Sequence, residues 1–170
     1  MNKLVAVIVL AGSLGAGSLA AKSVTVTLKD SKGMDVGTAR IADAAKGGVT
    51  ILLKVKGLTP GEHAAHIHTA AKCEGPGFTT AGGHFNPDMK HHGLDNPEGP
   101  HAGDMNNFTV DKKGRSKALL VNTRVNLNDD MHSVFSNGGT ALVIHAKADD
   151  YKTDPAGNAG DRIACGTITK

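Results

Sequence analysis

The feature that most constrains the fold is a series of short β-branched runs interrupted by turn residues. Val24–Leu28 and Val49–Val55 are two such runs, and Gly, Asp or Pro separates them from their neighbours. Similar runs cover residues 36–41, 118–122, 140–146 and 162–169. No stretch sustains the apolar period of a helix. The pattern therefore predicts an all-β domain of short strands, arranged as an antiparallel sandwich or a flattened barrel.

Two segments do not fit the strand pattern. Residues 69–104 are rich in Gly, Pro and His, and residues 147–161 are rich in Asp, Gly and Ala. Loops of this length in a compact domain are usually functional or disordered. A chain of 170 residues suits one domain with its own core. We therefore expect one functional site, and we expect these loops to contribute to it.

The first twenty residues differ in composition from the rest. Lys3 gives a short positive start, and residues 4–20 are uncharged and end in small residues. This pattern predicts a signal peptide over residues 1–20, cut after Ala20, and a mature domain over residues 21–170 that is periplasmic or secreted. An uncleaved membrane anchor is the competing interpretation. Glycine and serine weaken its apolar run, and no positive cluster follows it.

The charge pattern narrows the choice of partners. The formal net charge is +3, and the Lys and Arg residues are scattered, with no run that could follow a phosphate backbone. We therefore expect no nucleic-acid partner, and no membrane contact once the signal peptide is removed.

Cys73 and Cys165 are the two cysteines of the chain. Because a disulfide persists outside the cytosol, we predict that they are bonded. The alternative is a pair of buried free thiols.

The histidines are concentrated rather than spread along the chain. Seven of the nine lie between residues 63 and 101. His66 and His68 are two positions apart in a predicted strand, so their rings leave the same face and can share one metal ion. His145 ends an apolar run, where an unpaired imidazole would be costly, and it is the expected third ligand. A polar, solvent-facing strand is the alternative interpretation.

A second set of metal-ligand types lies in the first long loop. It consists of His84, His92, His101 and Asp104, with spacings of eight, nine and three residues. Three imidazoles and one carboxylate suit a closed tetrahedral zinc site. The alternative is a polar loop with incidental histidines.

Five separated segments together resemble the copper/zinc superoxide dismutases. They are Gly61–His68, Ala81–Pro87, His101–Asp104, Val143–His145 and Gly157–Gly166, and they occur in the order of that family. The resemblance runs from about residue 23 to residue 169. It implies an eight-stranded Greek-key β-barrel, an immunoglobulin-like sandwich with two long functional loops. One departure is Ala64-Ala65, where the family usually has Gly-Phe.

The resemblance implies a role for each residue of the site. Copper would be held by His66, His68, His84 and His145, and zinc by His84, His92, His101 and Asp104. His84 would serve both metals through its two nitrogens and would pass a proton, while Arg162 would guide the substrate anion. Asp149 would link a copper histidine to a zinc histidine. Cys73 and Cys165 would form the family disulfide. His63, His91 and His132 have no family role and are interpreted as surface or supporting residues.

The implied activity is superoxide dismutation, in which copper cycles between its two oxidation states and zinc structures the site. Two superoxide anions would yield oxygen and hydrogen peroxide, which would protect against extracytoplasmic superoxide. A homodimer is one assembly that the sequence leaves open.

Two other classes of function compete with this one. A copper carrier on the same fold would not need the anion guide Arg162. A zinc-stabilised adhesion domain would not need His66, His68 or His145.

Overall fold

The computed structural model describes residues 22–170, so the predicted signal peptide, residues 1–20, lies outside the described part of the chain. Within that part the protein is built from nine strands and two 3-10 turns. The strands are β1 (Ser23–Asp30), β2 (Asp35–Asp43), β3 (Val49–Lys56), β4 (Gly61–His63), β5 (Ala65–His68), β6 (Phe108–Val110), β7 (Arg115–Asn122), β8 (Thr140–His145) and β9 (Arg162–Ile168), and the turns are Thr79–Ala81 and Ser136–Gly138. No helix among residues 22–170 is long and apolar enough to cross a bilayer.

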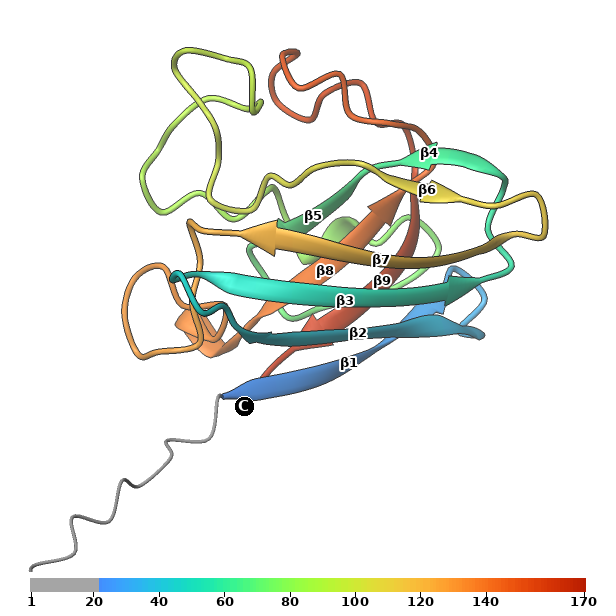
Figure 1. Ribbon diagram of the computed structural model, residues 1–170, viewed down its shortest axis with the longest axis horizontal. Helices are drawn as coiled ribbons and strands as arrows, with labels where there is room; N and C mark the ends of the chain where they lie inside the picture. Colours follow the sequence, from blue (N-terminus) through green and yellow to red (C-terminus); the bar gives the residue numbers. More distant parts are fainter. Residues whose placement is uncertain (1–21) are drawn as a thin grey trace, which may run out of the picture.

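The strands form one curled antiparallel sheet with a small second sheet. The order in the large sheet is β5-β8-β9-β1-β2-β3-β7, and β4 pairs with β6. In Figure 1, β8 and β9 pass behind β7 and β3, so the two ends of the large sheet enclose a common core. The predicted all-β barrel is confirmed.

Alternation along each strand supplies that core. In β3, Val49, Ile51, Leu53 and Val55 are buried, and the residues between them are less buried or exposed. A period of two places every second side chain on one face. Leu53 and Ile67 belong to the same hydrophobic cluster, so the inner faces of β3 and β5 pack together.

The segment that contains the strand predicted for His66 and His68 is divided at Ala64 into β4 and β5. The Ala64 N–H donates to the Lys147 carbonyl at 2.8 Å, and the Ala64 carbonyl accepts from His145 N–H at 3.0 Å. At this residue the chain leaves its partner β6 and joins β8. Counted together, β4 and β5 complete the eight strands implied by the family resemblance.

The second predicted loop, in orange-red, and the yellow-green part of the first loop lie on one side of the barrel, at the top of Figure 1, whereas the green part of the first loop lies beside β8 and β9. The Cys73–Cys165 disulfide is present and attaches the first loop to β9. Cys165 packs with Phe78, Ala81 and Val143 in a second small cluster. The disulfide therefore holds the segment around residues 73–81 against the outer face of β8 and β9.

Candidate metal centre

Strand β5 places two histidines on its outer face. Ala65 and Ile67 point into the hydrophobic core, so His66 and His68 point the opposite way, and all four are fully buried. His145 ends the neighbouring strand β8. His84 forms an isolated bridge with His68 at the edge of β5. The alternation of β5, its pairing with β8 and the bridge to His84 therefore bring the four predicted copper ligands to one place.

Four ring nitrogens meet there without hydrogen-bond partners. They are Nδ1 of His66 and Nε2 of His68, His84 and His145, and all are buried. Ligand atoms of these four residues lie within 4.8 Å of one another. A buried polar atom without a partner is costly, and four that converge suit one bound ion. Imidazole is a good ligand for copper.

The opposite nitrogen of three of these rings is already engaged. His66 Nε2 donates to Asp149 Oδ2 at 2.8 Å, His68 Nδ1 to the Gly82 carbonyl at 2.9 Å, and His145 Nδ1 to the Gly160 carbonyl at 3.3 Å. Because each acceptor needs a proton on that nitrogen, the free nitrogen of each neutral ring carries a lone pair. The surroundings thus select the tautomer that a metal requires.

A second group of ligand atoms surrounds Asp104. Its Oδ1 lies 2.8 Å from His84 Nδ1, 3.1 Å from His92 Nδ1 and 3.4 Å from His101 Nδ1. Ligand atoms of a tetrahedral zinc ion, at about 2.0–2.1 Å from the metal, would be about 3.3 Å apart. The other oxygen, Oδ2, accepts from the N–H groups of Gly93 and His101 at 3.0 Å each. The predicted zinc residues therefore form a compact, buried group that fits this ion.

His84 and Asp149 connect the two groups. His84 presents Nε2 to the first group and Nδ1 to the second. Asp149 accepts from His66 through Oδ2 at 2.8 Å and from His92 Nε2 through Oδ1 at 3.0 Å. Gly157 has a left-handed φ of +63°, and a side chain there would collide with Asp149 and with His92 Nε2. Residue 157 must therefore be glycine for these contacts to exist.

Two residues that the sequence did not indicate hold Asp149 in place. Asn107 Nδ2 donates to the Asp149 carbonyl, and Asp149 N–H donates to Asn107 Oδ1, both at 2.9 Å. Tyr151 N–H donates to Asp149 Oδ1 at 2.7 Å, and its phenol oxygen accepts from Asn107 N–H at 2.8 Å. No sequence pattern indicated Asn107, because its contacts with Asp149 and Tyr151 span more than 40 residues.

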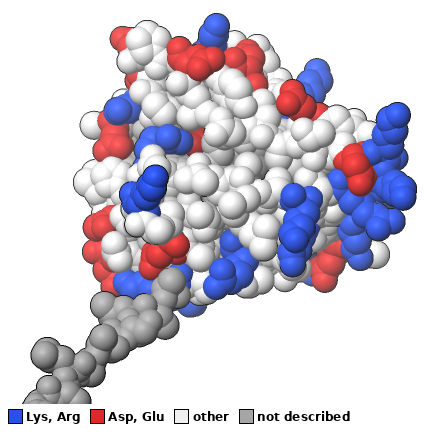
Figure 2. All heavy atoms as spheres, viewed as in Figure 1, with Lys and Arg blue, Asp and Glu red and all other residues white. Residues whose placement is uncertain are grey.

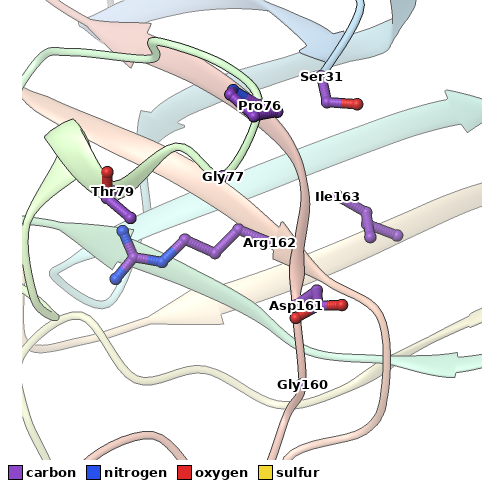
Figure 3. A pocket seen from close by; sticks show the side chains of 8 residues that line it. All are labelled: Ser31, Pro76, Gly77, Thr79, Gly160, Asp161, Arg162 and Ile163. Carbon is purple, nitrogen blue, oxygen red and sulfur yellow. The ribbon is translucent and has the colours of Figure 1, made fainter.

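Arg162 stands at the boundary between the histidines and a surface cavity of about 590 Å³. Its guanidinium donates to the carbonyls of Phe78 and Gly82, each at 2.8 Å. Figure 3 shows that the side chains of Arg162 and Asp161 point apart, as expected for adjacent residues where a strand begins. The adjacent carboxylate therefore does not pair with the guanidinium.

The electrostatics differ between the two groups. Burial, reinforced by the neighbouring charges, lowers the pKa of His68 to about 2 and that of His145 to about 3. Burial also lowers the pKa of His84 to about 4, against the opposing effect of Asp104. These rings are neutral near pH 7, as metal ligation requires.

His92 behaves in the opposite way. Burial acts to lower its pKa, but hydrogen bonds to Asp104 and Asp149 raise that pKa to about 9. The pKa values of Asp104 and Asp149 lie below the usual range, because contacts with the histidines outweigh burial.

The three remaining histidines lie outside both groups. His91 and His132 are partly exposed and contact the carboxylates of Asp154 and Asp88. His63 is buried, and its Nδ1 lies 2.8 Å from the His145 carbonyl. Of the neighbouring pair His91 and His92, His92 is the one inside the second group.

Comparison with known proteins agrees with this geometry. Residues 36–168 match the family model described as copper/zinc superoxide dismutase. Superoxide dismutase [Cu-Zn] 2 of Aquifex aeolicus is 52% identical over 143 residues, which cover 83% of each chain.

Two solved structures extend the comparison. The structure of a SOD-like protein from Bacillus subtilis has a TM-score of 0.82 at 36% identity, and the match covers 85% of this chain and 97% of that one. Cu/Zn superoxide dismutase from Brucella abortus has a TM-score of 0.71 at 30% identity, over 86% and 99% of the two chains. Sequence and fold thus lead to the same conclusion, that this chain belongs to the copper/zinc superoxide dismutase family, a family of oxidoreductases.

Proposed function

We propose that this protein disproportionates superoxide to oxygen and hydrogen peroxide at a copper and zinc centre outside the cytoplasm. Copper and zinc are the cofactors of the family, and the two ligand groups fit them. We assign copper to the first group, His66, His68, His84 and His145, and call it the copper group. We assign zinc to the second group, His84, His92, His101 and Asp104, and call it the zinc group. The observation that carries this assignment is the set of four buried, unpartnered ring nitrogens beside Arg162.

The bound metals supply a one-electron redox couple at copper and a fixed positive charge at zinc. Arg162 binds and orients the incoming anion, because its guanidinium is fixed by two carbonyls beside the cavity. Electrostatic steering of the anionic substrate is already known for superoxide dismutases, which are the general precedent for such a role. The net reaction consumes two superoxide anions and two protons, and it releases one oxygen and one hydrogen peroxide.

His84 is the residue placed to hold a proton for the product. Its Nε2 faces the copper group, whereas its Nδ1 is fixed in the zinc group. A proton held at Nε2 lies where peroxide forms, and solvent supplies the second proton. Asp149 accepts from His66 of one group and from His92 of the other, so it fixes the position of the two groups relative to each other. His84 Nε2 would hold either copper or the proton, and the contacts of Asp149 keep His66 and His92 in place in both cases.

The decisive experiment is a superoxide-consumption assay on protein reconstituted with copper and zinc. We expect activity in the parent chain and a loss of at least about 100-fold in His145→Ala, which removes one of the four nitrogens. His132→Ala is the matched control, because this histidine lies outside both groups. Equal activity in the parent and His145→Ala would contradict the copper assignment. Copper binding without activity in the parent would contradict the dismutase assignment and favour the carrier.

The location outside the cytoplasm is a separate part of the proposal. It is supported by the N-terminal signal pattern and by the disulfide, which is typical of oxidising compartments. Fractionation of cells that express the chain tests it. We expect the extracytoplasmic fraction to contain a form that begins at Ala21, and a full-length form in the cytoplasm would contradict the proposal.

A further inference from the structure

The sheet gathers cations that are separated in the sequence. Lys56 of β3 is directly opposite Arg115 of β7, and Lys54 is directly opposite Lys117. The hairpin between β6 and β7 adds two more exposed lysines. We call these six residues the basic end, and they are Lys54, Lys56, Lys112, Lys113, Arg115 and Lys117. Figure 2 shows Lys and Arg side chains gathered on the right, where β3 and β7 meet that hairpin.

The charges of the basic end are not neutralised within the molecule. Among residues 22–170, none of the six side chains forms an ion pair. The hairpin contains one carboxylate, Asp111, whose Oδ1 accepts from the N–H groups of Lys113 and Arg115. Six cations exceed the formal charge of +3 of the whole chain, so the remaining residues are net negative. Like charges directly opposite in a sheet are destabilising, so folding alone gives no reason for this arrangement.

The same strand face continues as an apolar surface. Leu119 is opposite Leu52, and Val121 is opposite Thr50, on the two rungs that follow Lys117 and Lys54. Leu119 is 64% exposed and Val121 is 50% exposed. Successive rungs on one face are about 7 Å apart. The outward face of β3 and β7 is therefore cationic at one end and aliphatic along its length.

This face and the metal centre lie on different parts of the barrel wall. Leu53 and Ile67 both point into the common core, so the side chains that alternate with them, Lys54 on β3 and His66 and His68 on β5, point outward from different parts of that wall. The basic end is therefore badly placed to guide an anion to the histidines. The positive charge of the basic end would instead attract an anionic partner other than the substrate.

The scattered cations of the sequence predict no membrane contact, whereas the register gathers them on one face. We propose that the outward face of β3 and β7 docks this protein onto an anionic phospholipid bilayer. The basic end contacts headgroup phosphates, and Leu119 and Val121 enter the boundary between headgroups and acyl chains. A soluble polyanion would neutralise the cations but would offer no apolar phase to the two aliphatic side chains. A second copy of the chain, related by a two-fold axis, would bring the same cations toward one another. Docking in this orientation leaves the metal centre facing solvent.

Vesicle sedimentation tests the proposal on metal-loaded protein that begins at Ala21. The probes are vesicles of phosphatidylcholine alone and vesicles with about a third of phosphatidylglycerol. We expect binding to the anionic vesicles only, and a marked loss when salt rises to about 0.5 M. Each cation near an anionic surface contributes roughly fivefold, so the double variant Lys54→Gln/Lys117→Gln should bind about 30-fold more weakly. The matched control Lys32→Gln/Lys46→Gln removes the same charge from exposed lysines elsewhere and should change binding by less than about threefold.

A second pair of substitutions separates the bilayer from other partners. Leu119→Ser/Val121→Ser should weaken vesicle binding by about tenfold and leave binding to heparin, a soluble polyanion, unchanged. Dismutase activity should be unchanged in all variants, which confirms that they fold. Equal losses in the two lysine variants would overturn the proposal, because net charge alone would then explain binding. Full vesicle binding by the serine variant would also overturn it. Loss of a dimer in the serine variant, seen by light scattering without any vesicle binding, would assign the face to self-association instead.

Discussion

The guanidinium of Arg162 donates to the carbonyl of Gly82 at 2.8 Å. The same oxygen accepts from His68 Nδ1 at 2.9 Å. A single backbone carbonyl therefore fixes both the cation at the cavity and a histidine of the copper group. Gly82 has a left-handed φ of +77°, and a side chain there would collide with Thr69. The position of the Arg162 guanidinium relative to the histidines therefore depends on this peptide group and on the Phe78 carbonyl, which also accepts from Arg162.

Replacing Arg162 with glutamine should lower the rate constant for superoxide without removing metal. The cation attracts the anion from solution, so its loss should cost about tenfold at low salt and less at high salt, where charges are screened. Stopped-flow decay of superoxide at several ionic strengths measures this effect. Lys46→Gln, an exposed lysine away from the cavity, is the control. An unchanged salt dependence in Arg162→Gln would rule out a guiding role.

Asp149→Asn should weaken the binding of both zinc and copper, because Asp149 accepts from one histidine of each group. Asp149 accepts from His92 of the zinc group, and comparable outer contacts change metal affinity by about 10–100-fold. Competition with a zinc chelator measures the change. The neighbouring carboxylate offers a matched control, because Asp150 contacts Thr153 and Asn158 rather than a histidine. Similar zinc affinities for Asp149→Asn and Asp150→Asn would show that the contacts of Asp149 do not contribute to zinc binding.

The metal-free protein should lose stability as the pH falls from about 6.5 to 4. Burial and neighbouring charges hold the pKa of His68 at about 2, that of His145 at about 3 and that of His84 at about 4. An unfolded chain has ordinary histidines near 6.5, so it takes up protons that the folded chain does not. Each of these histidines then lowers the free energy of unfolding by up to about 1.4 kcal/mol for each pH unit of acidification.

His92 adds the opposite dependence at higher pH. Its pKa is raised to about 9, so its contribution to the free energy of unfolding is complete below about pH 6.5 and is lost as the pH rises toward 9. Urea unfolding of metal-free protein between pH 4 and pH 9 should therefore show a maximum near neutrality. A flat profile below pH 6.5 would mean that the three low-pKa histidines are already solvated without metal.

Removing the disulfide should lower stability and disturb the position of Arg162. Cys73 and Cys165 are 92 residues apart, and in the chain-entropy account a closed loop of that length contributes at most about 4–5 kcal/mol. The carbonyls of Phe78 and Gly82, which hold Arg162, belong to the tethered loop. Cys73→Ser/Cys165→Ser should therefore unfold at lower denaturant and react more slowly with superoxide. A variant that is less stable but reacts with superoxide at the normal rate would show that the disulfide does not fix the position of Arg162.

The parts of the site that the sequence predicted are those that depend on short spacing. His66 and His68 share a face because a strand has a period of two, and the cluster of seven histidines indicated a ligand set before any contact was known. The assignment of individual residues to copper and to zinc rests on the family resemblance and stays a proposal. The ring atoms and their distances came from the structure.

The features that escaped prediction depend on partners far away in the chain. The break at Ala64 arises because β4 and β5 pair with different strands, which no local pattern records. Strand β6 is three residues long and gave no signal. Asn107 contacts Asp149 and Tyr151 from more than 40 residues away in the chain. The cations of β3 and β7 look scattered in the sequence, and only the register places Lys54 beside Lys117.

Gly157 has a practical consequence for anyone who redesigns this protein. The loop of residues 147–161 is mostly exposed and invites changes of length or composition. Any side chain at residue 157 would collide with Asp149 and His92. Changes elsewhere in the loop must therefore leave the backbone at this residue in place and without a side chain. Libraries that vary the loop should hold this position constant, because a single added methyl group would act as a wedge between the carboxylate and the ring.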